Sequence, residues 1–559
     1  MLKKLSFLVL ASGVTIAWWY RRNSTSGPVV GLDYGSFRGK SLHTHGIEQF
    51  FGIPYAEPPV GERRFTNPIP PLRTYWNHDS TKHPAVCPQQ SLGGNTSSIY
   101  KDWFDNLGLN PLMYLKPFGS GQEDCLTVDV TRPTGLTNDS KLPVIYFIYP
   151  GGYNYGASWE LTGVPIVKKS IEMNLPIIWV SGNHRTNAFG FLGGKEVGKA
   201  GVGNLGLKDQ RLTMQWIQKY ISQFGGDPEK VIVYGESSGA ISISHHLLAF
   251  NGNLNGLFRG AICQSGTALP VGKFSDGAGQ KGFDLLVNRL GCQDSNDKLD
   301  CLRHADLKKM QNVIDELPGT FSFGSFPLTF GPAVDGEFVT DSIQHALKNG
   351  RFAKVPVIVT DVQDEGTILA IGSYSVKTED EFREFISKKV PKASPEQIEK
   401  VLQLWPSDPT LGSPFGSGTK NAVTPVYKQY SAILGDFGFQ GLRRLFLRGT
   451  CDSMPTWSLL DRAAQHFPVV GAFHASDLPA VIGITPGNRS EDYQKRWISF
   501  AYQLDPNHEG LPKWEKYDDH HSLLLMDQDG SIGMEPDTFR EHEIDYYLEN
   551  LEDFVFASP

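Results

Sequence analysis

The chain has 559 residues, of which 40% are hydrophobic and 20% are charged, a composition typical of a globular protein with a large core. Its formal net charge is −8 and it contains no long basic run, so it lacks the positive surface that nucleic-acid binding requires. The sequence contains no internal repeat, low-complexity tract or long Pro/Ser-rich linker. We therefore expect one continuous domain over residues 28–555.

Residues 1–22 are predicted to form a targeting segment. Two lysines precede and two arginines follow an apolar stretch at residues 5–20, which is shorter than the ~20 residues of a spanning helix. Small residues at Thr15 and Ala17 favour a signal peptide cleaved after Ala17, and hence secretion. The alternative is an uncleaved membrane anchor, because the aromatic residues at 18–20 are typical of a membrane interface.

Six cysteines and four N-x-S/T glycosylation sequons are typical of a protein that folds in the oxidising secretory pathway. The sequons lie at Asn23, Asn95, Asn138 and Asn488. The cysteines are Cys87, Cys125, Cys263, Cys292, Cys301 and Cys451, and their spacing alone leaves the pairing open.

Five apolar runs rich in β-branched residues have the length and composition of strands buried on both faces. They lie at residues 142–149, 176–180, 231–234, 260–263 and 355–360. Helical periodicity is clearest at residues 210–224, where Leu212, Trp216, Tyr220 and Phe224 recur every four residues. The alternation of strands and helices predicts an α/β fold, with a large and mostly parallel sheet flanked by helices.

A glycine-rich turn, Pro150-Gly151-Gly152-Tyr153, follows the first of these strands. Glycine allows bare backbone to come close to a bound group. Gly151 and Gly152 are therefore candidate donors of an oxyanion hole, the set of N–H groups that stabilises a negatively charged oxygen in a transition state. The alternative is an ordinary tight turn.

The sequence Gly235-Glu236-Ser237-Ser238-Gly239 directly follows the predicted strand 231–234 and precedes a helical stretch. A strand, a G-x-S-x-G turn and a helix form the arrangement that exposes a serine nucleophile at a strained turn. The pattern is weak by itself, but its position makes Ser237 the candidate nucleophile. The backbone N–H of Ser238 is then a third candidate oxyanion donor.

Several longer motifs occur in a fixed order along the chain. They are FGIPYAEPPVG at 51–61, EDCL at 123–126, GLKDQR at 206–211, FGGDP at 224–228, the serine turn, QSG at 264–266 and DEGT at 364–367. Together they resemble the type-B carboxylesterases, which include cholinesterases, secreted fungal lipases and sterol esterases, over roughly residues 28–530. The resemblance implies an α/β-hydrolase fold and a serine hydrolase that cleaves carboxylic esters through an acyl-enzyme intermediate, without a cofactor.

The resemblance also implies the other members of a catalytic triad. The triad acid corresponds to Glu365 of the DEGT motif, and the neighbouring Asp364 is rejected. The general base corresponds to His474, in the segment at 473–477. The chain order Ser237, Glu365, His474 agrees with the nucleophile, acid, histidine order of α/β-hydrolases.

Two disulfides are implied in the same way, Cys87 with Cys125 and Cys292 with Cys301, which leaves Cys263 and Cys451 as thiols. The first disulfide would close a loop at 88–124 that is rich in apolar residues, and we expect this loop to act as a lid. The alternative is that the loop packs permanently on the domain.

Three features depart from the family pattern. Pro150 replaces a third glycine, Ser238 stands where alanine is usual, and the segment NHRTN at 183–187 replaces a more usual NYRLG. These changes remove no catalytic group, and they favour a specialised substrate.

We expect the substrate to be a small-molecule or lipid ester, so the chain is predicted to be a lipase or sterol esterase, which would contact a lipid interface, or a general carboxylesterase. The alternative is a non-catalytic adhesion or binding protein with the same fold. The pairs His245-His246 and His520-His521 lack the further ligands of a metal site, so we expect no metal. The sequence makes no prediction of the oligomeric state.

Overall fold

The structure is a computed structural model that describes residues 27–92, 118–274, 278–320, 329–371, 373, 376, 378–518 and 520–556. The predicted targeting segment, most of the lid-like loop 88–124 and the sequons at Asn23 and Asn95 lie outside these residues. The sequons at Asn138 and Asn488 lie on exposed residues.

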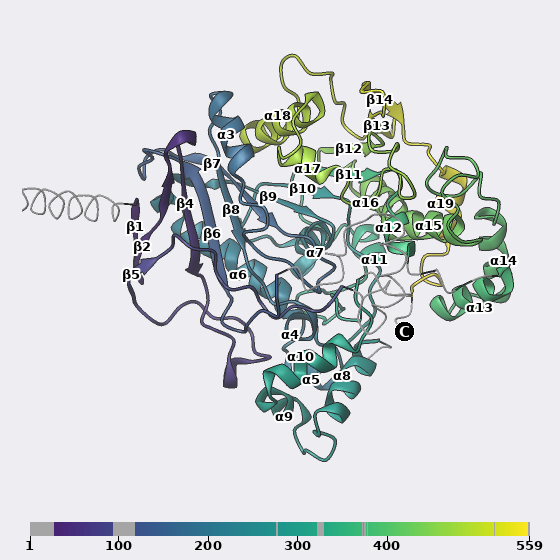
Figure 1. The fold of residues 1–559 in the computed structure, drawn as a ribbon, viewed down its shortest axis with the longest axis horizontal. Helices are drawn as coiled ribbons and strands as arrows, with labels where there is room; N and C mark the ends of the chain where they lie inside the picture. The colour runs from purple at the N-terminus through teal and green to yellow at the C-terminus, as the bar shows by residue number, and fades with distance from the viewer. Residues whose placement is uncertain are drawn as a thin grey trace, which may run out of the picture.

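A central sheet of eleven strands runs through the molecule (Figure 1). In spatial order the strands are β14 (Ile532–Pro536), β13 (Ser522–Met526), β12 (Thr456–Asp461), β11 (Val357–Val362), β10 (Gly260–Gln264), β9 (Gly226–Glu236), β7 (Leu142–Ile148), β8 (Ile178–Gly182), β6 (Thr127–Pro133), β4 (Ile47–Pro54) and β3 (Lys40–Leu42). A separate three-stranded sheet contains β1 (Val29–Leu32), β2 (Gly35–Arg38) and β5 (Tyr75–Asp79).

The middle of the large sheet is parallel, as the sequence predicts. Strands β8, β7, β9, β10, β11, β12 and β13 pair in parallel, whereas β14, β6, β4 and β3 add antiparallel edges. All five predicted strand segments lie in this parallel part, as β7, β8, β9, β10 and β11. Parallel strands need crossover connections, and helices supply them here.

The helices cover both faces of the sheet. The longer ones are α3 (Val164–Glu172), α6 (Leu205–Tyr220), α7 (Ser238–Gly252), α8 (Ala278–Arg289), α10 (Leu307–Asp315), α13 (Glu379–Lys389), α14 (Pro395–Leu404), α15 (Tyr427–Gly435), α16 (Gly441–Thr450), α18 (Asn488–Gln503) and α19 (Glu541–Glu549). The shorter ones are η1 (His43–His45), η2 (Gly61–Arg63), α4 (Asn187–Phe191), α5 (Lys195–Ala200), η5 (Ile221–Phe224), α9 (Lys298–His304), α11 (Ile343–Lys348), α12 (Thr367–Ala370), η7 (Asp436–Gln440) and α17 (Leu478–Val481). The predicted helix 210–224 corresponds to the end of α6 together with η5.

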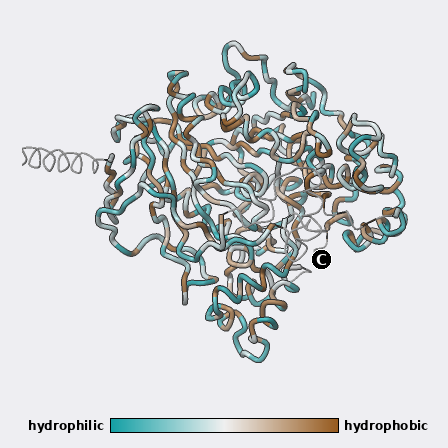
Figure 2. Tube along the Cα trace, viewed as in Figure 1, coloured by the Kyte–Doolittle hydropathy of each residue, from teal (hydrophilic) through white to brown (hydrophobic). Residues whose placement is uncertain are grey.

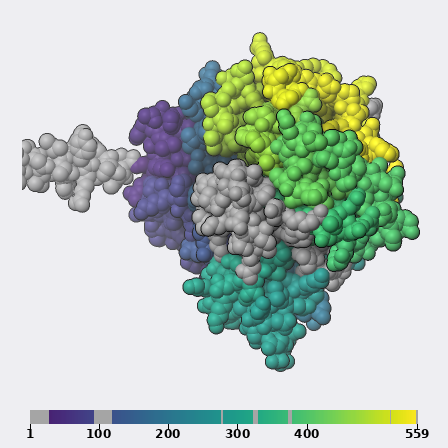
Figure 3. All heavy atoms as spheres, turned by 45° about the vertical axis from the view of Figure 1, so that its right-hand side comes forward, coloured from purple at the N-terminus to yellow at the C-terminus, as the bar shows by residue number. Residues whose placement is uncertain are grey.

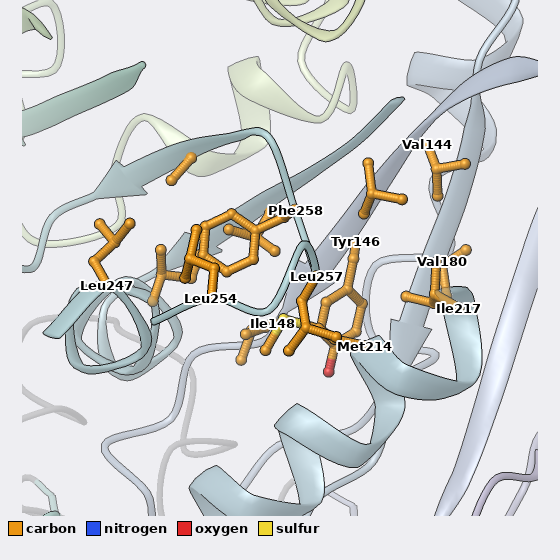
Figure 4. Close-up of a cluster of buried hydrophobic side chains, with 14 of the residues drawn as sticks. Val144, Tyr146, Ile148, Val180, Met214, Ile217, Leu247, Leu254, Leu257 and Phe258 are labelled. Carbon is orange, nitrogen blue, oxygen red and sulfur yellow. The ribbon is translucent and has the colours of Figure 1, made fainter. Parts of the chain in front are cut away.

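Alternate residues of each central strand enter different cores. Val144, Tyr146 and Ile148 of β7 pack with side chains of α6 and α7, among them Met214 and Leu247 (Figure 4). The intervening residues 145, 147 and 149 pack with α3 and α18 on the opposite face. Burial on both faces explains why these strands read as continuous apolar runs in the sequence. Hydrophobic residues accordingly fill the centre of the fold, and hydrophilic residues predominate on the outer loops (Figure 2).

Two disulfides constrain loops of this framework. They join Cys87 to Cys125 and Cys292 to Cys301, the pairing that the resemblance implied. The second disulfide lies in a lobe that contains α8, α9 and α10 and projects from the body of the molecule (Figure 3). Cys263 is buried in β10 and Cys451 follows α16, both outside these bridges.

In the part of the chain that the structure describes, which begins at residue 27, no helix is both long enough and apolar enough to cross a bilayer.

Candidate active site

Ser237 lies at the sharp turn between β9 and α7. Its backbone is in an unusual conformation, with φ 54° and ψ −124°, and helix α7 begins at the next residue. A Cβ added to Gly239 would lie 2.0 Å from the carbonyl oxygen of Ile148, and one added to Gly235 would lie 2.5 Å from the backbone of Gly239. Only glycine fits at these two positions, and the turn therefore holds Ser237 at the carboxyl edge of the sheet.

His474 and Glu365 reach the same edge from loops that follow β12 and β11. His474 Nε2 lies 2.8 Å from Ser237 Oγ, and His474 Nδ1 lies 2.5 Å from Glu365 Oε2. Glu365 is fully buried, and its second oxygen accepts a hydrogen bond of 2.9 Å from the Val362 backbone N–H. The three side chains that the sequence singled out thus form one continuous hydrogen-bonded chain.

Asp364, the neighbour of Glu365, points elsewhere. Its carboxylate accepts hydrogen bonds from Ser413 Oγ at 2.8 Å, from the Phe415 N–H at 2.9 Å and from the Ala472 N–H at 3.0 Å. Burial raises the pKa of this carboxyl to about 6. Asp364 therefore joins the loop after β11 to the loop that carries His474.

A second carboxylate, Glu236, lies beside the imidazole. Its Oε1 is 3.5 Å from His474 Nε2, and the side chain is fully buried. Burial alone lowers the pKa of His474, but the charges of Glu365 and Glu236 outweigh burial and raise this pKa to about 9. Burial raises the pKa of Glu236 itself to about 8. Glu236 was not among the predicted site residues, although an ionisable residue directly before the nucleophile, at the end of a buried strand, is a signal that could have identified it.

The turn after β7 brings backbone donors to the same place. Gly151 and Gly152 both have positive φ, 116° and 58°, and a Cβ on Gly151 would lie 2.2 Å from the carbonyl oxygen of Tyr155. Within the described part of the chain, no hydrogen bond uses the N–H of Gly151 or Gly152. Ser238 is the first residue of α7, where backbone N–H groups have no partner inside the helix. Pro150 is accommodated at the start of this turn and leaves the following N–H groups unused.

The glycine turn, Ser237, Ser238, His474 and Glu236 line one cavity of about 280 Å³, whereas Glu365 and Asp364 lie behind its lining. Its polar wall contains the glycine turn, Glu160, Glu236, Ser237 and His474. Its other walls are largely apolar and include Ile241, Leu269, Ile368, Leu369, Phe439, Phe473 and Leu478. A polar reaction centre inside an apolar cavity can orient an ester carbonyl while it accommodates a hydrocarbon chain.

A smaller cavity of about 70 Å³ adjoins the first at Leu269, which lines both. Its walls include Tyr153, Phe437 and Tyr547, together with Phe554, Val555 and Phe556 near the C-terminus. Residues 554–556 are almost 300 positions from Leu269 in the sequence, so no local pattern could have identified them.

The paired histidines at 245–246 and 520–521 do not line the active-site cavity. His245 and His246 are buried in α7, and His246 Nε2 lies 3.0 Å from Gln210 Oε1. His521 stacks on Tyr517, with ring centroids 5.2 Å apart. Among the described residues, one group of three ligand-type side chains is close enough to hold a metal, the surface cluster Glu62, Asp300 and His304, and none of the three lines the cavity.

Comparison with known proteins identifies the chain. The model of the Carboxylesterase family matches residues 26–545. Lipase 4 of Diutina rugosa is 38% identical over 483 residues, covering 84% of this chain and 86% of that protein. The secreted triacylglycerol lipase LIP1 of Gibberella zeae is 33% identical, covering 94% of this chain and 89% of that protein. The crystal structure of Aspergillus niger EstA superposes with a TM-score of 0.78 at 27% identity, covering 95% of this chain and 99% of that one.

These likenesses cover nearly the whole chain in both sequence and fold. They set aside the alternative of a non-catalytic adhesion or binding protein. The chain belongs to the carboxylesterase family and is an α/β-hydrolase that cleaves carboxylic esters as a serine hydrolase.

Proposed function

We propose that Ser237, His474 and Glu365 form the catalytic triad and that the enzyme acts on esters of long-chain acids. The observation that carries this proposal is the hydrogen-bonded chain from Glu365 through His474 to Ser237, which opens into an apolar cavity. Ser237 Oγ attacks the ester carbonyl while His474 Nε2 takes its proton. Glu365 holds the imidazole in the tautomer that leaves Nε2 free to accept.

The oxyanion formed by this attack is stabilised by backbone donors. The N–H groups of Gly151 and Gly152 are unused by the rest of the described chain, and that of Ser238 lies at the start of α7. The positive end of the α7 dipole adds to this stabilisation. His474 then gives its proton to the leaving alcohol, and a water activated by the same histidine hydrolyses the acyl-enzyme.

The second cavity supports the proposal that the substrate has a long acyl chain. Leu269 lines both cavities, and we propose that an acyl chain that fills the first extends past Leu269 into the second. The names of the fungal relatives, a lipase and a secreted triacylglycerol lipase, agree with a lipid ester as substrate. We propose secretion for the same reason, and contact with a lipid surface through the 88–124 loop stays a prediction.

The test is hydrolysis of p-nitrophenyl esters from C2 to C16 by the wild type, Ser237→Ala and Leu269→Trp, with and without detergent. We expect an optimum at long chains in the wild type and a loss of kcat on the order of 10⁶ in Ser237→Ala. Leu269→Trp should move the optimum to shorter chains, because the indole fills the junction between the cavities. Near-normal turnover by Ser237→Ala would reject the triad, and a short-chain optimum in the wild type would indicate a carboxylesterase for soluble esters.

A further inference from the structure

The polar wall of the active-site cavity contains two carboxylates that the triad does not include, Glu160 and Glu236. Glu160 lies between the glycine turn and α3, lines the cavity and is exposed to solvent. Glu236 is fully buried, and neither of its oxygens has a hydrogen-bond partner among the described residues. A buried carboxylate without any donor is costly, so a polar group supplied by a ligand would lower the free energy of this wall.

The two carboxylates are electrostatically coupled. Burial raises the pKa of Glu236 to about 8, and the charge of Glu160 adds to this effect. Among the described residues that line the cavity, no lysine or arginine is present to offset their charge. A donor that enters the cavity therefore meets two acceptors, of which Glu236 already lies 3.5 Å from the imidazole of His474.

The chemistry of the triad indicates which half of the ester faces this pair. His474 Nε2 delivers the proton to the leaving alcohol, so the alcohol oxygen lies next to Nε2 when the ester bond breaks. Glu236 Oε1 is 3.5 Å from the same nitrogen. The acyl chain, by contrast, is assigned to the apolar side that contains Leu269.

We propose that Glu160, together with Glu236, forms a subsite for the leaving alcohol that selects esters whose alcohol carries a hydrogen-bond donor, either a hydroxyl or a protonated amine. The subsite rests on the proposed acyl-transfer mechanism. Glu160 is the specificity-determining member because it is the more accessible of the two carboxylates. Glu236 supplies the second acceptor and stays close to the imidazole.

The experiment compares two isosteric pairs of butyrate esters that give the same acyl-enzyme. One pair is 2-hydroxyethyl and propyl butyrate, and the other is 2-(dimethylamino)ethyl and 3-methylbutyl butyrate. For each pair we measure the ratio of kcat/KM for the donor-bearing ester to kcat/KM for its apolar isostere. The enzymes are the wild type, Glu160→Gln, Glu160→Leu and the matched control Glu229→Gln, which changes an exposed glutamate outside the cavity.

We expect wild-type ratios above one, a fall of about tenfold in Glu160→Gln and a larger fall in Glu160→Leu, since a charge-assisted hydrogen bond is lost. Glu229→Gln should keep the wild-type ratios. A fall in the hydroxyl pair alone, or in the amine pair alone, would support the subsite and identify its donor. Ratios that stay the same in both Glu160 variants would overturn the subsite while leaving the triad intact, because the esters would still be hydrolysed.

A second measurement uses only the wild-type enzyme and tests its inhibition by free alcohols. Inhibition of the wild type by 2-(dimethylamino)ethanol and by ethylene glycol is compared with inhibition by 3-methylbutanol and by propanol. At least one donor-bearing alcohol should inhibit more strongly than its isostere, and equal inhibition within both pairs would count against the subsite. Failure of the wild type to hydrolyse either these four esters or the long-chain p-nitrophenyl esters would instead reject the proposed function, and the subsite with it.

Discussion

The carboxylates around His474 show how two chemically identical groups acquire different roles from their surroundings. Glu365 accepts hydrogen bonds from the Val362 N–H and from His474 Nδ1, so its charge is stabilised. Glu236 is buried, has no hydrogen-bond partner in the part of the chain that the structure describes, and burial raises its pKa to about 8. The same burial would lower the pKa of His474 if the two carboxylates were absent. The imidazole therefore depends on their charges for its basicity.

This dependence predicts the pH profile of the enzyme. His474 accepts a proton only when neutral, so kcat/KM should fall as the pH drops through its pKa. The groups that raise this pKa are Glu365, Glu236 and Asp477, and they place the acidic limb above the ordinary histidine value. Glu236→Gln removes one of these negative charges, so the limb should move to lower pH. The limb is measured from kcat/KM for p-nitrophenyl butyrate between pH 5 and 10, with Glu229→Gln as the control. An unchanged limb in Glu236→Gln would contradict the proposed electrostatic coupling.

At the scale of elements, the site is assembled by loops at the carboxyl ends of parallel strands. β9 presents Ser237, β11 presents Glu365 and the loop after β12 presents His474. Asp364 ties two of these loops together, since it accepts hydrogen bonds from the Phe415 and Ala472 N–H groups. Its role is to position the histidine loop, whereas Glu365 contacts the histidine itself.

Substitutions at the adjacent residues Asp364 and Glu365 distinguish the positioning of the histidine loop from direct contact with the histidine. Glu365→Gln should lower kcat by on the order of 10⁴, because the imidazole loses the acceptor that sets its tautomer, while Tm changes little. Asp364→Asn should lower the free energy of unfolding by about 1–3 kcal/mol, because buried donors lose an acceptor, and should reduce kcat far less. Both are checked by thermal unfolding and by hydrolysis of p-nitrophenyl butyrate. A larger loss of kcat in Asp364→Asn than in Glu365→Gln would contradict the assignment of Glu365 as the triad acid.

At the scale of the whole molecule, one continuous sheet organises both cores. Residues 144, 146 and 148 face α6 and α7, and residues 145, 147 and 149 face α3 and α18. Two disulfides of different loop length add covalent constraints to this framework. Cys87–Cys125 spans 38 positions, and Cys292–Cys301 spans 9.

Loop length predicts how much each disulfide contributes to stability. Removing Cys87–Cys125 by paired alanine substitutions should lower the free energy of unfolding by about 4 kcal/mol, because the unfolded chain regains the entropy of a long loop. The same change at Cys292–Cys301 should cost about 3 kcal/mol, because the loop is shorter. Thermal or urea unfolding of the two double variants measures both values. A larger loss for the shorter loop would show that packing around the lobe, not chain entropy, dominates.

The sequence by itself determined the local elements, because their signals are local. Continuous apolar runs predicted β7 to β11, and the glycines around Ser237 predicted a turn that no larger residue can make. His474 is one of 15 histidines, and it was distinguished only through the family motifs. The tertiary structure alone decided which distant groups meet. It placed the unpartnered Glu236 beside His474, added Glu160 to the same wall, and brought the C-terminal residues 554–556 against a cavity that adjoins Leu269. The physical reason is that burial, electrostatic coupling and cavity shape depend on contacts between residues far apart in the chain, which no local periodicity encodes.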